Sequence, residues 1–147
     1  MVDRREDTRA AFMALLEERV EACKVKDLDR LMSLYSPEVA YYDVVLPLKF
    51  AGTDDVRQNF QRWFDEYQGD IGLETHDLHV AMDGDVAFAH MLHADSGTRR
   101  SGQDMVVWLR ATVCAQWIDG RWQIVHEHVS FPINPGDWSA VIDAEPA

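Results

Sequence analysis

One segment decides the fold: Trp117-Ile118-Asp119-Gly120-Arg121-Trp122-Gln123-Ile124-Val125-His126-Glu127-His128-Val129-Ser130, which follows the apolar run 105–116. Asp119-Gly120 separates two runs that are rich in β-forming residues. This dipeptide suits the type I′ turn, in which both central residues have a positive φ. The sequence therefore predicts one long β-hairpin with Asp119 and Gly120 at its tip.

The position of this turn also predicts the register of the hairpin. Side chains alternate between the two faces of a strand, so pairing outward from the tip assigns a face to each residue. The predicted pairs are Trp117 with Trp122, Ala115 with Ile124, Val113 with His126, and Ala111 with His128. In this register one face is apolar except where His126 and His128 enter it. An apolar face with a polar end is typical of a ligand pocket.

Length and composition limit the class of protein. The 147 residues suffice for one domain with one core, so we expect a single domain over residues 1–147. A net charge of -12 disfavours binding to nucleic acid or to an anionic membrane. Cys23 and Cys114 lack the spacing of a metal or redox motif, which favours reduced thiols and a cytoplasmic location. The N-terminal region has no uninterrupted apolar stretch, so we expect no signal peptide and no membrane span.

Helical periodicity dominates the first part of the chain. Apolar residues recur at helical spacing from about Thr8 to Lys26, and Arg19 falls on the same stripe. A buried arginine is costly unless it is paired. The alternative is that its aliphatic stem packs inside while the guanidinium reaches water. A short second helix, capped by Asp27, is predicted to follow.

A strand and a third helix come next, before a second hairpin. The run 39–44 predicts a strand with Val39, Tyr41 and Asp43 on one face. Gly52-Thr53 opens the third predicted helix, whose apolar stripe is Val56, Phe60, Trp63, Phe64 and Tyr67. Residues 71–82 and 85–94 predict two strands joined at Asp83-Gly84, and 95–103 are expected to form a polar loop.

This order of elements resembles the cone of the nuclear transport factor 2-like superfamily, which includes ketosteroid isomerases and SnoaL-type polyketide cyclases. Residues 27–35, Asp43 and Gly52-Thr53 resemble the isomerase pattern. Residues 117–130 are similar to the association domain of calcium/calmodulin-dependent protein kinase. The resemblance implies an α+β, cone-shaped fold with N-terminal helices packed on a curved, mostly antiparallel sheet.

The same resemblance implies a site inside the cone. In the isomerases the aspartate after the first strand is the base that moves a proton beside a carbonyl, and Asp43 occupies that position. Their two oxyanion donors fall at Arg19 and at about Val113, so both are missing and steroid isomerisation is not expected. Asp43, His126 and His128 are the expected catalytic residues, since a carboxylate opposite hydrogen-bond donors can form and stabilise an enolate. The residues expected to bind substrate are Arg19, Tyr41, Trp63 and Val113.

Two functions remain open from the sequence. The first is a cofactor-free isomerase, cyclase or lyase that acts on a small organic molecule, with Asp43 as general base. The second is a non-catalytic ligand-binding or association module in which Arg19, His126 and His128 hold a small carboxylate. Arg19 and Asp43 could instead simply pair with each other.

The last expectations from the sequence concern metal ions, cofactors and the oligomeric state. His126, His128 and Asp43 could in principle form a three-ligand metal site, but no metal and no cofactor is expected. We expect a homodimer formed through the mixed polar and apolar face of the sheet.

Overall fold

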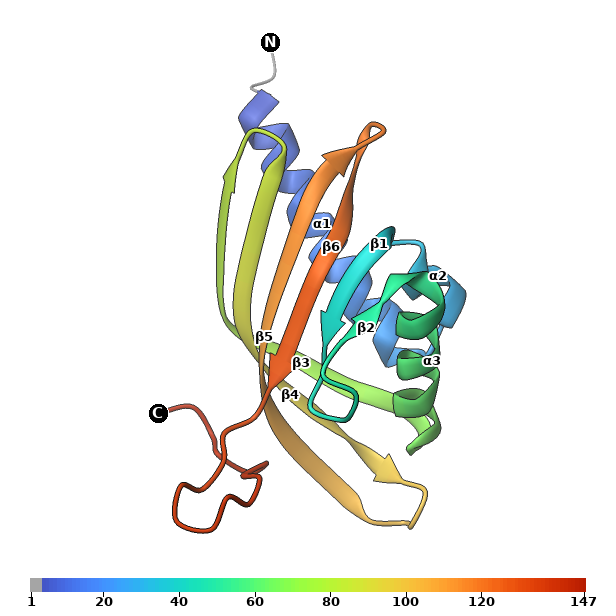
Figure 1. Ribbon diagram of the computed structural model, residues 1–147, viewed down its shortest axis with the longest axis vertical. Coiled ribbons are helices and arrows are strands. Elements are labelled where there is room, and N and C mark those ends of the chain that lie inside the picture. Colours follow the sequence, from blue (N-terminus) through green and yellow to red (C-terminus); the bar gives the residue numbers. More distant parts are fainter. Residues whose placement is uncertain (1–3) are drawn as a thin grey trace.

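The computed structural model describes residues 4–147 and combines N-terminal helices with one curved sheet (Figure 1). The elements are α1 (Arg4–Lys24), α2 (Leu28–Met32), β1 (Tyr35–Tyr42), β2 (Phe50–Ala51), α3 (Gly52–Asp65), β3 (Tyr67–Asp83), β4 (Val86–Arg99), β5 (Asp104–Ile118) and β6 (Arg121–Ser130). The α+β, cone-shaped fold class that the sequence predicted is confirmed. Within these residues, no helix is both long enough and apolar enough to span a membrane.

The sheet has six strands in the order β2-β1-β6-β5-β4-β3. Every neighbouring pair is antiparallel except β1 and β6, which run parallel. The four long strands β3 to β6 bend together, and α1 runs obliquely behind the upper part of the sheet in this view (Figure 1). Phe12 of α1, Val56 of α3 and Val113 of β5 are among the fully buried residues of the core between helices and sheet.

The predicted starts of the short second helix and of the third helix are confirmed, but Tyr67 does not belong to the stripe of the third helix, because α3 ends at Asp65 and Tyr67 begins β3. The Asp27 carboxylate accepts a hydrogen bond from the Arg30 amide at 3.1 Å and so caps the first turn of α2. Gly52 begins α3 with a φ of 82°, a conformation that glycine adopts without steric cost. These two helix starts set the path of the chain on either side of β1.

The β5–β6 hairpin has the predicted turn but not the predicted register. Asp119 and Gly120 both have positive φ, and Trp117 pairs with Trp122 as expected. After the Ala115–Ile124 pair, the next pair is Cys114 with His126. Val125 is therefore an extra residue in β6 that has no partner in β5. This is a β-bulge, in which two residues of one strand oppose one residue of the other.

The bulge reverses the faces of every later residue in β6. Val113 lies opposite Glu127 rather than His126, and the predicted Ala111–His128 pair is likewise wrong. Glu127 is therefore directed into the core and is 1% exposed, whereas His128 is exposed on the outer face. A shift of one residue has this effect because strand side chains alternate with a period of two.

The predicted loop at 95–103 is also wrong, because β4 continues to Arg99. Its polar residues pair on both sides: Asp95, for example, lies between Leu73 of β3 and Val107 of β5. Gly97 allows this continuation, since a Cβ atom there would lie 2.8 Å from the Tyr67 ring. The consequence is that Asp95 faces the interior and is 4% exposed.

Candidate functional site

A cavity of about 240 Å³ lies between α1, α3 and the sheet. Phe60, Trp63, Leu73 and Val107 contribute to its apolar lining. Charged and polar side chains also line it: Arg19, Tyr41, Asp43, Arg62, Glu66, Asp95, Arg99 and Glu127. A largely apolar cavity with a few convergent polar groups is the usual form of a small-molecule site.

A buried ion pair joins α1 to β6 in the lining of this cavity. Arg19 Nε and Nη2 donate to Glu127 Oε1 and Oε2, each at 2.9 Å. Tyr35 also donates to Oε1, at 2.6 Å. Arg19 is 5% exposed and Glu127 is 1% exposed, so this bidentate pair is shielded from water.

The ion pair keeps both of its members charged. Burial alone would lower the pKa of Arg19, but attraction to Glu127 and the hydrogen bonds between them raise it well above its ordinary value. Burial alone would raise the pKa of Glu127. The charge of Arg19 and the hydrogen bonds from Arg19, Tyr35 and Tyr41 hold that pKa below its ordinary value.

His93 of β4 completes the environment of Arg19. Its Nε2 lies 3.2 Å from Arg19 Nη1. Because the guanidinium can only donate, Nε2 must accept, and the ring proton resides on Nδ1, which lies 3.3 Å from Thr75 Oγ1. Burial, reinforced by the charge of Arg19, lowers the pKa of His93 to about 3. His93 is therefore a neutral ring whose accepting nitrogen is already occupied.

Asp95 lies two residues further along the same face of β4. Its Oδ1 is buried and has no hydrogen-bond partner. Burial raises the pKa of this carboxyl to about 7, and the charge of Asp43 adds to the increase, although Arg19 and Arg99 oppose it. The cavity thus contains a buried carboxyl group that is poised between its neutral and charged forms at neutral pH.

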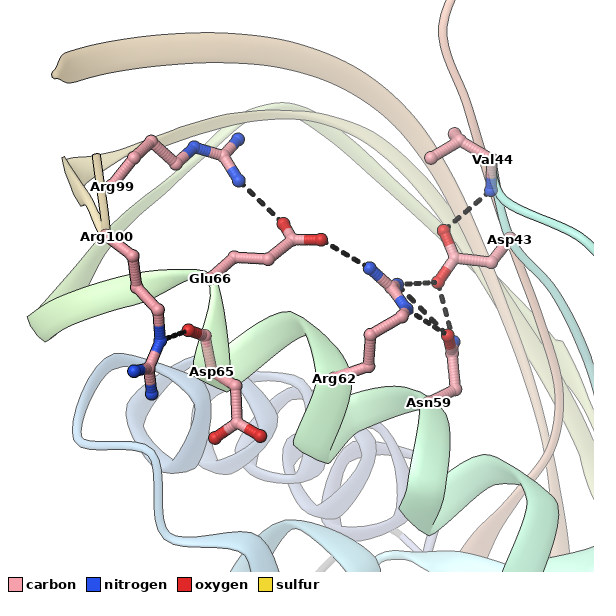
Figure 2. Close-up of polar contacts among 8 residues, drawn as sticks. All are labelled: Asp43, Val44, Asn59, Arg62, Asp65, Glu66, Arg99 and Arg100. Carbon is pink, nitrogen blue, oxygen red and sulfur yellow. Dashed lines mark hydrogen bonds and ion pairs between the residues drawn. The ribbon is translucent and has the colours of Figure 1, made fainter.

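Asp43 stands at the rim of the cavity just after β1, with 12% of its side chain exposed (Figure 2). Asn59 Nδ2 of α3 donates to Oδ2 at 2.6 Å. The Val44 amide donates to Oδ1, also at 2.6 Å. Arg62 Nη2 lies 3.7 Å from Oδ2. These donors suit an ionised carboxylate and fix its orientation.

The rim continues as a chain of alternating charges (Figure 2). Arg62 bonds to Glu66 at 2.5 Å, and Glu66 accepts a bond from Arg99 at 2.6 Å. The guanidinium of Arg99 lies 4.5 Å from the centre of the Tyr67 ring, within the range of a cation–π contact. These contacts join α3 to the end of β4.

The structure brings together four of the residues that the sequence singled out. Arg19, Tyr41, Asp43 and Trp63 all line the cavity. Arg19 is inward and paired, as one of the two readings of its position expected, but its partner is Glu127, so the alternative in which Arg19 pairs with Asp43 does not hold. Val113 is 0% exposed and belongs to the core rather than to the cavity lining.

His126 and His128 lie outside the cavity, on the opposite face of the sheet. His126 Nδ1 donates to the Ala40 carbonyl oxygen at 2.7 Å. Tyr42 packs against both rings, with centroids 4.7 and 5.4 Å away. Because the bulge at Val125 turns them away from Asp43, the sequence-based assignment of both histidines to the catalytic site is not supported by their positions.

The sequence analysis missed several residues of the site: Asn59, Arg62, Glu66, His93, Asp95, Arg99 and Glu127. The bulge that turns Glu127 inward has no recognisable signal in the sequence. His93 and Asp95 could have been found by continuing the strand past Ala94, because a period of two places them on the same face as Ala87, Ala89 and Met91, which the structure buries.

Metal binding has no geometric support in the part of the chain that the structure describes. There, no group of three or more His, Cys, Asp or Glu side chains is arranged to hold a metal ion. The three-ligand combination of Asp43, His126 and His128 is therefore not assembled.

Comparisons with known proteins agree with this fold. In structure, the chain resembles an NTF2-like protein of unknown function from Pseudomonas putida KT2440, with 25% identity, a TM-score of 0.86, and coverage of 96% of this chain and 98% of the other. A ketosteroid isomerase-like protein from Erwinia carotovora atroseptica SCRI1043 has 17% identity, a TM-score of 0.72, and coverage of 82% and 93%. A hexachlorocyclohexane dehydrochlorinase, LinA-type3, from Novosphingobium barchaimii LL02 has 14% identity, a TM-score of 0.75, and coverage of 86% and 87%.

Sequence comparison adds the family. A search of curated proteins found no match. Residues 13–134 match the SnoaL-like domain, and this range includes Arg19, Asp43, Asp95 and Glu127. The chain therefore belongs to the SnoaL-like family of the nuclear transport factor 2-like superfamily.

Proposed function

We propose that this chain binds a small, largely apolar carbonyl compound in its cavity and moves a proton on that compound without a cofactor, with Asp43 as the general base. The observation that carries this proposal is the position of Asp43: a carboxylate at the rim of a cavity that is otherwise mostly apolar. A carboxylate so placed can reach a C–H bond beside a carbonyl group.

The contacts of Asp43 support this role. The hydrogen bonds from Asn59 and Val44 engage one lone pair on each carboxylate oxygen. Each oxygen has a second lone pair, so the group can still accept a proton. Because the carboxylate is fixed before the ligand arrives, its orientation need not be established during the reaction.

The reaction is balanced without an oxidant or a reductant. Asp43 takes a proton from the carbon next to the carbonyl group, and the electrons of that C–H bond form an enolate. Return of the proton to a conjugated carbon gives an isomer, while loss of a leaving group gives elimination. The cyclase, isomerase and lyase alternatives share this first step.

The experiment that tests this function is proton exchange in D₂O. The probe is 1-tetralone, a bicyclic ketone, and the loss of its C2 proton signal is followed by NMR. We expect Asp43→Asn to slow the protein-dependent exchange by about 100-fold or more. Asp83→Asn, which makes the same charge change at an exposed site, serves as the matched control. Equal exchange rates in the wild type and Asp43→Asn would disprove the role of Asp43.

A second candidate function is a non-catalytic module that holds a small carboxylate. Arg19 is poorly suited to this task, because all three of its nitrogens already face Glu127 or His93. One observation favours Arg99 instead: its Nε is buried without a partner, and the residue lines the cavity. In that case affinity for benzoate would fall in Arg99→Met and would not depend on Asp43.

We also propose a homodimer formed through the outer face of the sheet. No described helix covers this face in Figure 1. Val86, Phe88 and Val106 lie on this face at separate positions and expose 51%, 48% and 54% of their surface, and exposed apolar side chains on one face favour association. Light scattering after size exclusion should give the mass of a dimer for the wild type and of a monomer for Phe88→Glu. A monomeric wild type would exclude this assembly.

A cytoplasmic location is the last part of the proposal. It is supported by the two cysteines, Cys23 and Cys114, which are both free thiols. Cell fractionation of the native host would test it, and recovery in an extracytoplasmic fraction would contradict it.

A further inference from the structure

The tail that follows β6 contributes to the cavity from outside the SnoaL-like domain. The match to that domain ends at residue 134, whereas Ile142 of the tail lines the cavity together with Phe131. Figure 1 shows the tail as a loop beyond the lower end of β6. Its path back to the cavity follows from the way in which β6 ends.

Strand β6 ends before its neighbour β5 does. The ladder between the two strands stops at the pair of Ser130 with Arg110, although β5 begins at Asp104. In the same register Pro132 would lie opposite Trp108, but proline has no amide hydrogen and cannot continue the ladder. The backbone of β5 is therefore left with an open edge close to the cavity.

The tail folds back on itself after Phe131. Ile133 and Ala140 form an antiparallel bridge. The Val141 amide donates to the Pro132 carbonyl oxygen at 2.8 Å, in the same register. Residues 131–142 thus form a short hairpin, the tail hairpin, whose second arm returns towards the sheet.

The returning arm of the tail hairpin fills the open edge of β5. The Ile142 carbonyl oxygen accepts a hydrogen bond from the Trp108 amide at 2.9 Å. Ile142 therefore takes the place in the sheet that Pro132 would have held. One further pair in the register of the hairpin sets Ile142 opposite Phe131. This pairing explains why both side chains reach the same cavity.

The side chains of this wall can act on a ligand only through their shape. Phe131 and Ile142 are apolar, as are Val107 and Leu109 of β5, which also line the cavity. Such side chains exclude volume but offer no directed hydrogen bond. The cavity volume of about 240 Å³ is smaller than the ~300–1,000 Å³ usual for sites that hold drug-sized ligands, which favours a compact ligand.

Ile142 can be changed without opening the core. It is half-buried, whereas Val113 and Ile124 of the adjoining strands are 0% exposed. Its link to the sheet is made by the backbone, through the bond from Trp108, and so does not depend on the identity of the side chain. A substitution at Ile142 therefore alters the space in the cavity more than the stability of the fold.

We propose that Ile142 sets the size limit of the ligand, because its side chain closes the cavity beside the end of β5. This inference rests on the proposed function, in which an apolar carbonyl compound occupies the cavity. It names the substrate class more closely: compact ketones of about two fused rings, with a third ring excluded by the tail hairpin. The residue that imposes this limit lies outside the SnoaL-like domain.

The experiment compares 1-tetralone with 3,4-dihydrophenanthren-1(2H)-one, a ketone that has one further fused ring. Dissociation constants are measured by ligand-observed NMR for the wild type, Ile142→Ala, Ile142→Trp and the matched control Ile133→Ala. Ile133 belongs to the same hairpin and is 45% exposed, but it is not part of the cavity lining. Urea unfolding of each variant verifies that it is folded.

The expected changes have opposite directions in the two Ile142 variants. In the wild type, the tricyclic ketone should bind at least about tenfold more weakly than 1-tetralone, because its third ring overpacks the cavity. Ile142→Ala should reduce this ratio to about twofold. Ile142→Trp should weaken the binding of 1-tetralone itself by about tenfold. Ile133→Ala should keep both dissociation constants within about twofold of the wild type.

Three results would overturn the inference. They are a ratio that stays the same in Ile142→Ala, an unchanged affinity for 1-tetralone in Ile142→Trp, and a change in Ile133→Ala as large as that in Ile142→Ala, which would assign the effect to the hairpin as a whole.

The proton-exchange experiment separates this inference from the proposed function. Binding that follows the size limit without Asp43-dependent exchange would refute catalysis alone. Asp43-dependent exchange with equal binding in all the variants would refute the role of Ile142 alone. Failure of both ketones to bind any of these proteins at millimolar concentration would refute the ligand class of the proposed function and the size limit together.

Discussion

Replacing Asp95 with asparagine should stabilise the protein, and the gain should grow as the pH rises. Asparagine has nearly the same shape as aspartic acid but stays neutral. Folding raises the pKa of Asp95 from 3.8 to about 7. Between these values the folded state holds a proton that the unfolded state has released, so the stability of the wild type falls as the pH increases.

The size of the effect follows from this shift. Each pKa unit corresponds to about 1.4 kcal/mol, so the full difference is about 4 kcal/mol. The stabilising contribution of the neutral acid is complete below the unfolded pKa and is lost as the pH rises through the folded pKa. The difference in unfolding free energy between Asp95→Asn and the wild type should therefore increase by about 3 kcal/mol from about pH 4.5 to about pH 8.

Urea unfolding of the two proteins across this pH range measures the difference directly. Other groups that titrate, including His93, are present in both proteins and cancel to first order. Asp83→Asn, an exposed replacement, should show no comparable increase. A difference that stays constant, or that shrinks towards high pH, would refute the argument that Asp95 is neutral because it is buried without a partner.

Three further outcomes test other parts of the site by urea unfolding. Arg19→Met should lower the free energy of unfolding by about 3–5 kcal/mol, because it leaves Glu127 charged and buried without its partner. The double variant Arg19→Met with Glu127→Leu should recover part of that loss; equal losses in the single and the double variant would contradict this. The wild type should lose stability as the pH falls from about 6.5 towards 3, because the unfolded chain binds a proton on His93 in this range and the folded protein does not. His93→Gln should remove this loss; a parallel pH dependence of the unfolding free energy in both proteins would oppose the assignment. Gly97→Ala should cost about 1–3 kcal/mol, since its Cβ would meet Tyr67 at 2.8 Å; an unchanged midpoint would show that Tyr67 moves freely.

The fold was predictable because its signals are local. Asp119-Gly120 specified a turn through its φ requirements, and Asp27 and Gly52 marked two helix starts. Each of these positions depends on a few neighbouring residues and on backbone geometry that few residue types can adopt. The order of the elements followed from them, and with it the resemblance to the superfamily.

The candidate site was less predictable because its faces depend on register. Counting from the turn was correct as far as the pair formed by Ala115 and Ile124. The extra residue at Val125 then exchanged the places of Glu127 and its two neighbouring histidines, and no propensity of valine indicates such a bulge. Asp95 was missed for a different reason. The residues that follow it in the sequence are polar and resemble a loop, although in the structure β3 and β5 pair with this segment of β4 on both sides.

The bulge in β6 and the buried Arg19 depend on each other. Without the extra residue, Glu127 would face outward and Arg19 would be a buried charge with no counterion, which costs several kcal/mol. With it, the pair is complete and keeps its donors engaged within the protein. Arg19 therefore cannot bind an oxyanion in this cavity, because all three of its nitrogens face Glu127 or His93. Among the described residues, the buried polar atoms of the cavity lining that have no partner are Arg99 Nε and Asp95 Oδ1, so these two groups are the ones left to meet a ligand.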